Sequence, residues 1–226
     1  MRLAAVVPAL DEEASLPRAL ASALEAADLT VVADGGSTDA TADLAHSAGA
    51  IVLQSPSGRG RQLNAGARAA LDRGADVLLF LHADTVLPPR ARASIEAAVA
   101  GGAVGGGFEV RFDDPRRIFA LGSRIVNLRT RLLRAPLGDQ AQFVERAAFL
   151  ALEGFREWPI LEDLDLIRRL RRRGPIAILR PPAITAARRF AERGITRTIV
   201  TNWSIWALYL LGVDPVRLAR LYPHLR

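Results

Sequence analysis

Cysteine is absent from this 226-residue chain, and lysine is absent as well. Without cysteine, disulfides and thiolate metal sites such as zinc ribbons are excluded, and a reducing, cytoplasmic compartment is expected. Without lysine, all 30 basic residues are arginine, which favours forked contacts with phosphates and carboxylates.

Long apolar runs are missing too. The longest candidate, residues 199–213, contains Asn202 and Ser204 and is shorter than the roughly 18 apolar residues that a membrane span needs. The first residues enter a strand-like run that meets Pro8 and three acids at 11–13, so no signal peptide is expected. These absences predict a chain without a transmembrane segment.

The formal net charge is +6. The arginines gather in three places, none of which has interleaved aromatic residues for stacking on bases: residues 59–61, 168–173 and 188–189. We therefore expect no binding to nucleic acid. The run at 168–173 follows a helical period, which is typical of a solvated helix face.

Apolar runs alternate with helical patterns through the first hundred residues. Strands are expected at 3–7, 30–33, 51–54 and 77–81, and helices at 15–27, 38–48, 61–71 and 90–99. Later strands are expected at 108–112 and 142–144, and later helices at 116–133, 196–211 and 215–221. The pattern predicts one α/β domain over residues 1–226, with a mostly parallel sheet, helices on both faces and a C-terminal helical segment.

Polar groups follow the expected strands, where parallel sheets bind their ligands. Asp84 comes directly after the buried run 77–81, with His82 two residues earlier on the same side of the extended chain. Asp34 ends the second strand, and Arg59 and Arg61 follow the third. Acids beside arginines suit a ligand with a polar heterocycle and phosphates, and Asp84 can hold a divalent cation that bridges two phosphates. Alone, Asp84 could equally cap the helix that follows Pro89.

Several segments of the sequence together resemble a known protein family. They are residues 7–13, residues 31–41, the triplet His82-Ala83-Asp84, residues 138–143, and the acid pair Glu162-Asp163. In this order and spacing the chain resembles family 2 glycosyltransferases of the GT-A fold. Finer details at 60–66, 80–85 and 187–190 are similar to a small bacterial subfamily associated with radical-enzyme and selenium-domain genes, or with arsenosugar biosynthesis.

The resemblance implies a nucleotide-sugar-binding half at about 1–110 and an acceptor-binding half at about 111–226. It implies that the nucleotide is bound by Pro8, Ala9, Leu10, Glu12, Asp34, Arg61, Asn64, His82 and Ala83. It also implies that Asp84 holds Mn²⁺ or Mg²⁺ and that Arg188 and Arg189 face the diphosphate. His82 replaces the first acid of the usual Asp-x-Asp motif, so the metal chosen and the ribose contact depart from the family pattern.

The same resemblance implies that Asp163 is the catalytic base, with Glu162 beside it and with Gln140 and Trp158 on the acceptor side. The expected reaction is metal-dependent and inverting, since one displacement with one base inverts the anomeric carbon. The donor would be a UDP-sugar and the acceptor is not specified. An acidic first helical turn favoured by the macrodipole remains the alternative for this pair.

Two other functions remain open. A non-catalytic nucleotide-sugar-binding protein would keep the base pocket without needing Asp163. A sugar-phosphate nucleotidyltransferase would need a glycine-rich basic loop after the first strand, and residues 8–11 are not such a loop. The aromatic helix face at 203–210 could serve core packing, a homodimer, or peripheral contact with an acceptor lipid or the inner face of the membrane.

Overall fold

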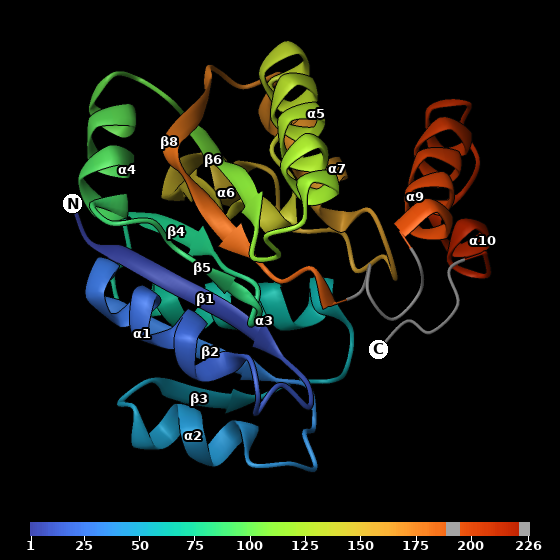
Figure 1. The fold of residues 1–226 in the computed structure, drawn as a ribbon. Coiled ribbons are helices and arrows are strands. Elements are labelled where there is room, and N and C mark those ends of the chain that lie inside the picture. Colours follow the sequence, from blue (N-terminus) through green and yellow to red (C-terminus); the bar gives the residue numbers. More distant parts are fainter. Residues whose placement is uncertain (189–194, 222–226) are drawn as a thin grey trace.

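The computed structural model describes residues 1–188 and 195–221, which form one α/β domain (Figure 1). Its strands are β1 (Leu3–Ala9), β2 (Leu29–Asp34), β3 (Ile51–Gln54), β4 (Val77–Phe80), β5 (Thr85–Val86), β6 (Gly105–Phe112), β7 (Gln142–Glu145) and β8 (Ile176–Thr185). Its helices are α1 (Leu16–Ala26), α2 (Thr41–Ser47), α3 (Arg59–Asp72), α4 (Ala91–Ala100), α5 (Arg117–Leu133), α6 (Arg146–Ala151), α7 (Glu162–Leu170), α9 (Ile195–Leu210) and α10 (Pro215–Ala219), with a 3₁₀ turn, η1, at Gly138–Gln140.

The strands form a single eight-stranded sheet in the order β3-β2-β1-β4-β7-β6-β8-β5. β1 pairs in parallel with β2 and β4, and β2 pairs in parallel with β3, so the mostly parallel sheet is confirmed. β7 runs antiparallel to both of its neighbours, whereas β6 and β8 are parallel to each other. The carboxyl ends of β1, β2, β4, β6 and β8 therefore meet at one edge of the sheet.

Helices cover both faces of the sheet, as predicted. Alternate residues of β1 point to opposite sides, so Leu3 and Val7 pack with α1 and α4 while Ala4 and Val6 pack with α3 and α7. α3 lies very close to β1 at Gly66, where a side-chain Cβ would stand only 2.4 Å from Val6 Cγ1. The absence of a side chain at Gly66 permits this approach. This close contact holds the start of α3 over the site edge of the sheet.

β8 was not expected from the sequence. Pro181 and Pro182 lie within it, and prolines cannot donate to a strand ladder. The pairing with β6 shifts register between Phe108 and Val110, and this irregularity accommodates the prolines. β8 completes the sheet beyond β6 and carries the chain back to the site edge.

The C-terminal helical segment is confirmed. α9 and α10 stand beside the rest of the domain in Figure 1 and share a small core formed by Ile160, Ile205 and Leu218. Trp206 and Tyr209 of α9 pack against the core between the sheet and α3 and α7, whereas Leu210 is exposed, so core packing accounts for these two rings. Within residues 1–188 and 195–221, no helix is both long enough and apolar enough to cross a membrane.

Candidate active site

The turns after β1 and β2 are joined to each other at the site edge. Asp11 Oδ1 accepts a hydrogen bond from the backbone N–H of Thr38 at 2.9 Å. Gln62 of α3 is buried, and its Nε2 donates to the carbonyl oxygens of Ala9 at 2.8 Å and Ala33 at 2.9 Å. One side chain thus satisfies carbonyls near the ends of two neighbouring strands and holds α3 beside the predicted nucleotide-binding residues.

Asp34 ends β2 with only 1% of its surface exposed. Its carboxylate accepts hydrogen bonds from the backbone N–H and the hydroxyl of Ser37, and Oδ2 also accepts from Gln54 Nε2 at 2.8 Å. Asp34 therefore shapes the turn from within, and its contact with a base stays a prediction.

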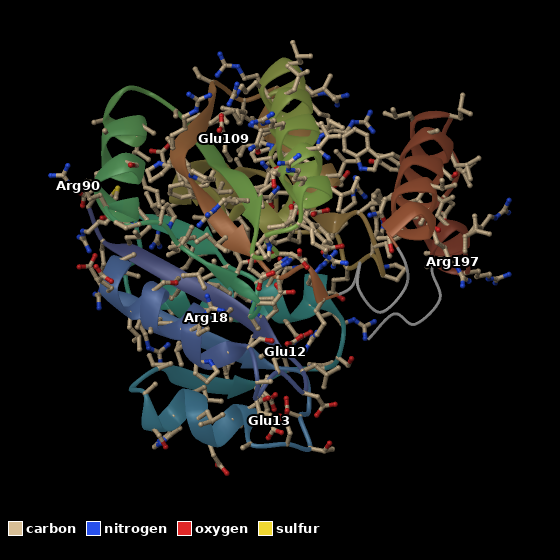
Figure 2. The ribbon with its side chains drawn as sticks, viewed as in Figure 1. Glu12, Glu13, Arg18, Arg90, Glu109 and Arg197 are labelled. Atoms are coloured by element: carbon tan, nitrogen blue, oxygen red, sulfur yellow. The ribbon has the colours of Figure 1, made fainter. Side chains whose placement is uncertain are left out.

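The predicted nucleotide-binding residues at the end of β1 differ in exposure. Pro8 and Ala9 are buried in the strand, whereas Leu10 and Glu12 are partly exposed beyond its end. Figure 2 labels Glu12 in this position. Glu12 Oε2 lies 3.4 Å from Nη2 of Arg188, which follows β8. The ends of β1 and β8 therefore place an acid and a predicted phosphate-binding arginine at the same edge.

Asp84 is held beside the end of β8. The Ala186 N–H donates to the Asp84 carbonyl at 3.1 Å, and the hydroxyls of Thr85 and Thr185 lie 3.1 Å apart in the buried layer beneath. Ala83 is buried in the core, whereas Asp84 is partly exposed. The backbone around Asp84 is thus fixed while its carboxylate remains accessible.

His82 and Asp163 converge on Gly138. A Cβ built on Gly138 would stand 2.5 Å from His82 Nε2 and 3.1 Å from Asp163 Oδ2. The Gly138 N–H donates to Asp163 Oδ2 at 2.7 Å, and the Leu164 N–H donates to Oδ1 at 2.7 Å. Asp163 therefore lies in the acidic first turn of α7 and also binds the η1 loop, so a place in that turn does not exclude a role as the base.

Asp139 is a site residue that the sequence analysis missed. Burial raises its pKa to about 6, Arg129 opposes the shift, and the negative charges of Asp163 and Asp84 add to it. Burial also lowers the pKa of Arg129, whose Nε has no hydrogen-bond partner and whose guanidinium carbon lies 5.1 Å from the Trp206 ring centre. The sequence offered a signal for Asp139, because it directly follows Gly138 in the loop assigned to the site. It offered no signal for Arg129, which is one of several arginines on α5.

Glu162 lies behind Asp163 and has no exposed surface. Its Oε1 pairs with Arg59 Nε of α3, a residue 103 positions away, and its Oε2 has no hydrogen-bond partner. Burial raises the pKa of Glu162, Arg59 opposes this shift, and the charge of Asp163 adds to it. Glu162 therefore connects α3 to α7 and positions the acid beside it, while Asp163 remains the candidate base.

The side chains of Asn64 and Gln140 form hydrogen bonds with backbone groups of the protein. The Asn64 amide donates to the Phe155 carbonyl at 2.8 Å and accepts from the Phe155 N–H at 2.9 Å. Gln140 is 0% exposed, accepts from the Leu137 N–H at 3.0 Å and donates to the Phe108 carbonyl at 2.9 Å. We therefore assign Gln140 to support of the η1 loop in place of the expected contact with an acceptor, because its amide is enclosed and fully used.

The remaining predicted residues lie farther out or beyond the described part. Arg61 pairs with Glu157 at 3.2 Å, with about half of each side chain exposed. Trp158 is partly exposed and meets the Tyr209 ring edge-on, with the ring centres 6.3 Å apart. Arg189 lies outside the described residues.

A divalent cation fits the chemistry of this edge. Within residues 1–188 and 195–221, no three His, Cys, Asp or Glu side chains form a ready-made metal cage. Mg²⁺ and similar ions usually need only one or two carboxylates, because substrate phosphates and water complete the shell. Burial is the main cause of the raised pKa of Asp139, and the negative charges of Asp163 and Asp84 add to it. A bound cation would relieve this added repulsion.

Solved structures share this fold. TarS residues 1–349 from S. aureus superpose with a TM-score of 0.59 at 18% identity, covering 82% of this chain and 60% of that one. Glucosyl-3-phosphoglycerate synthase from Mycobacterium tuberculosis superposes with a TM-score of 0.55 at 21% identity, covering 82% of this chain and 69% of that one. These likenesses confirm the GT-A type fold, and the chain spans 60% of the length of the TarS fragment.

Comparison with curated proteins found no match. The family model described as "Glycosyl transferase family 2" matches residues 4–150. The matched segment is more than half of the chain and contains the turns after β1, β2 and β4 together with the η1 loop. The chain therefore belongs to glycosyl transferase family 2.

Proposed function

We propose that the chain is a metal-dependent, inverting glycosyltransferase that moves a sugar from a UDP-sugar to an acceptor hydroxyl. The observation that carries this proposal is the meeting of Asp84, Asp139 and Asp163 at one edge of the sheet, with His82 and Asp163 both against Gly138. Two relatives support the donor class, since the mycobacterial synthase was solved with Mn²⁺ and UDP-glucose and TarS was solved with UDP.

The residues of about 1–110 would bind the donor. Leu10 and Glu12, which are partly exposed, would contact the nucleotide, and Asp34 would keep the turn after β2 in shape for the base. Asp84 would hold a divalent cation, which when bound neutralises charge on the departing diphosphate. Arg188 pairs with Glu12 in the free protein and would turn its guanidinium to the diphosphate, where forked contacts are strong.

Asp163 would act as the base from the acceptor half, about 111–226. The acceptor oxygen attacks the anomeric carbon, the bond from that carbon to the diphosphate oxygen breaks, and the hydroxyl proton passes to Asp163. The N–H groups of Gly138 and Leu164 fix the direction of the carboxylate before the acceptor arrives. Attack from the side opposite the diphosphate inverts the anomeric centre.

The test is UDP release from a panel of UDP-sugars with Mn²⁺ or Mg²⁺, compared between the wild type and Asp163→Asn. Asparagine keeps the shape but cannot take a proton, so kcat should fall by about 10²–10⁴ while UDP-sugar affinity stays nearly unchanged. Undiminished turnover in this variant would refute the assignment of the base. Binding without turnover in the wild type would favour the non-catalytic nucleotide-sugar-binding protein instead.

The finer assignments stay predictions. They are the bacterial subfamily, the cytoplasmic location and a homodimer.

The nucleotidyltransferase alternative receives no support from the turn after β1, which carries three acids at 11–13.

A further inference from the structure

The outward face of α5 is apolar. Five of its large aliphatic side chains are strongly exposed: Ile118 at 44%, Leu121 at 50%, Ile125 at 49%, Leu128 at 57% and Leu132 at 74%. They follow one another at alternating spacings of three and four, so they lie along one line of the helix, which we call the α5 seam.

The other side of α5 already has its partner. Phe119, Ser123 and Thr130 are buried against the domain. The Asn127 amide accepts from the Val110 N–H at 2.8 Å and donates to the Val110 carbonyl at 2.9 Å, which satisfies the backbone of β6 beyond its short pairing with β7. The helix is thus fixed on the sheet by its inner face.

Arginines border the seam. α5 contains four arginines and no acid, and Arg117, Arg124 and Arg131 each precede a seam residue at intervals of seven. Figure 2 shows Glu109 near α5. This acid already forms ion pairs, since its Oε1 lies 2.6 Å from Arg131 Nη2 and 2.9 Å from Arg180 Nε. Glu109 therefore balances Arg131, and Arg117 and Arg124 are the positive charges that border the seam.

This charge decides what can cover the seam. If α5 paired with α5 of a second copy, the border arginines would face arginines of the partner helix, with no acid on either helix to offset the repulsion. An anionic lipid surface offers the complement, because aliphatic side chains enter the acyl boundary while arginines reach phosphate groups. We propose that the α5 seam docks the protein on an anionic phospholipid surface.

The docking surface is connected to the candidate active site. Near the end of α5, the Thr130 hydroxyl lies 3.0 Å from Gln140 Oε1, and Gln140 supports the loop that holds Asp163. Docking by α5 would therefore bring the acceptor side of the site near the lipid surface. The proposal rests on the seam and its arginines alone and stands independently of the sugar transfer.

The test is co-sedimentation of the chain with phosphatidylcholine vesicles, with and without phosphatidylglycerol. The wild type should bind only the anionic vesicles, and added salt should release it. Leu121→Glu/Leu128→Glu should lower partitioning by more than about tenfold, because the seam becomes acidic. Arg117→Gln/Arg124→Gln should also lower it by about tenfold, whereas the charge-preserving Arg117→Lys/Arg124→Lys should bind as the wild type does.

The matched control is Leu44→Glu. Leu44 is 37% exposed on α2, which lies at the opposite end of the molecule from α5 in Figure 1, so this change should leave vesicle binding intact. Wild-type protein that ignores anionic vesicles, or a Leu121→Glu/Leu128→Glu variant that binds them normally, would overturn the proposal. A wild-type dimer in light scattering that this variant dissociates would overturn it too, because the seam would then be a self-interface.

Discussion

Asp139 should make the stability of the protein depend on pH. Its pKa in the folded chain is about 6, against an ordinary value of 3.8, so the folded state holds this proton more tightly than the unfolded state. Wild-type stability should fall as pH rises from about 4 to about 6 and stay lower above that. Asp139→Asn should therefore raise the free energy of unfolding by about 1–3 kcal/mol at pH 7.5 and by almost nothing below pH 4.

Urea unfolding of both proteins at these two pH values measures the effect. The same substitution at the exposed Asp72, near the end of α3, is the control. An equal gain for Asp139→Asn at both pH values would show that packing, and not charge, is responsible.

Gly138 has no room for a side chain. In Gly138→Ala the new Cβ would meet His82 Nε2 at 2.5 Å and Asp163 Oδ2 at 3.1 Å, so one of these groups must move. Displacement of the candidate base should lower kcat by about 10²-fold, because misplacement of about an ångström has effects of this size. Steady-state kinetics with a UDP-sugar substrate measures this, and circular dichroism establishes that the variant is folded.

Gly122→Ala is the matched glycine control. Gly122 lies inside α5, and its new Cβ would make an ordinary contact with Phe112 at 3.7 Å. Because glycine weakens a helix interior, this change should stabilise the protein by about 0.5–1 kcal/mol and leave kcat unaltered. A similar loss of activity in both alanine variants would remove the argument for Gly138.

The contact between α3 and α7 depends on one ion pair. Glu162 is fully buried and its only charged partner among the described residues is Arg59, so Arg59→Ala would leave an uncompensated buried carboxylate. The expected loss is about 3 kcal/mol in urea unfolding. Arg59→Ala/Glu162→Gln should recover part of it, since the buried charge is then gone.

Arg61 provides the comparison on the same helix. Its pair with Glu157 is exposed on both sides, at 53% and 51%, so Arg61→Ala should lower stability by less than about 1 kcal/mol. Equal losses at Arg59 and Arg61 would mean that burial of Glu162 does not govern the first effect.

The elements differ in how well the sequence predicts them. β1 to β4 and the helices between them carry apolar runs and helical spacing strong enough to place each one within about three residues. β8 carries the opposite signal, because Pro181 and Pro182 argue against a strand. Its place in the sheet follows from a register shift against β6, which is a tertiary arrangement and leaves no local pattern.

At the level of the whole molecule, the sequence identifies the loops of the site better than the side chains that face it. Strand ends predict that Asp84 lies at the site edge, because parallel strands share an edge. Burial cannot be predicted in this way, so Gln140 was expected at an acceptor and is instead enclosed. The charge interaction between Asp139 and Arg129 links the η1 loop to α5, and no sequence pattern indicates that these two residues lie near each other.

The crowding of acids gives the last prediction, a reversal of sign on ligand binding. Without ligand, Asp84→Ala removes a negative charge that faces Asp139, so the free energy of unfolding should stay equal or rise slightly above pH 6. With UDP and Mn²⁺ at about a hundred times the dissociation constant, the wild type should gain about 2.7 kcal/mol, and removal of the metal with a chelator should reverse most of it. Asp84→Ala should lose the metal-dependent part of this gain and become the less stable protein. Thermal unfolding of both proteins, with and without UDP and Mn²⁺, measures all four states. A variant that is weaker by the same amount with and without ligand would mean that Asp84 serves the fold and does not hold a cation, because loss of a cation ligand lowers stability only where the cation binds.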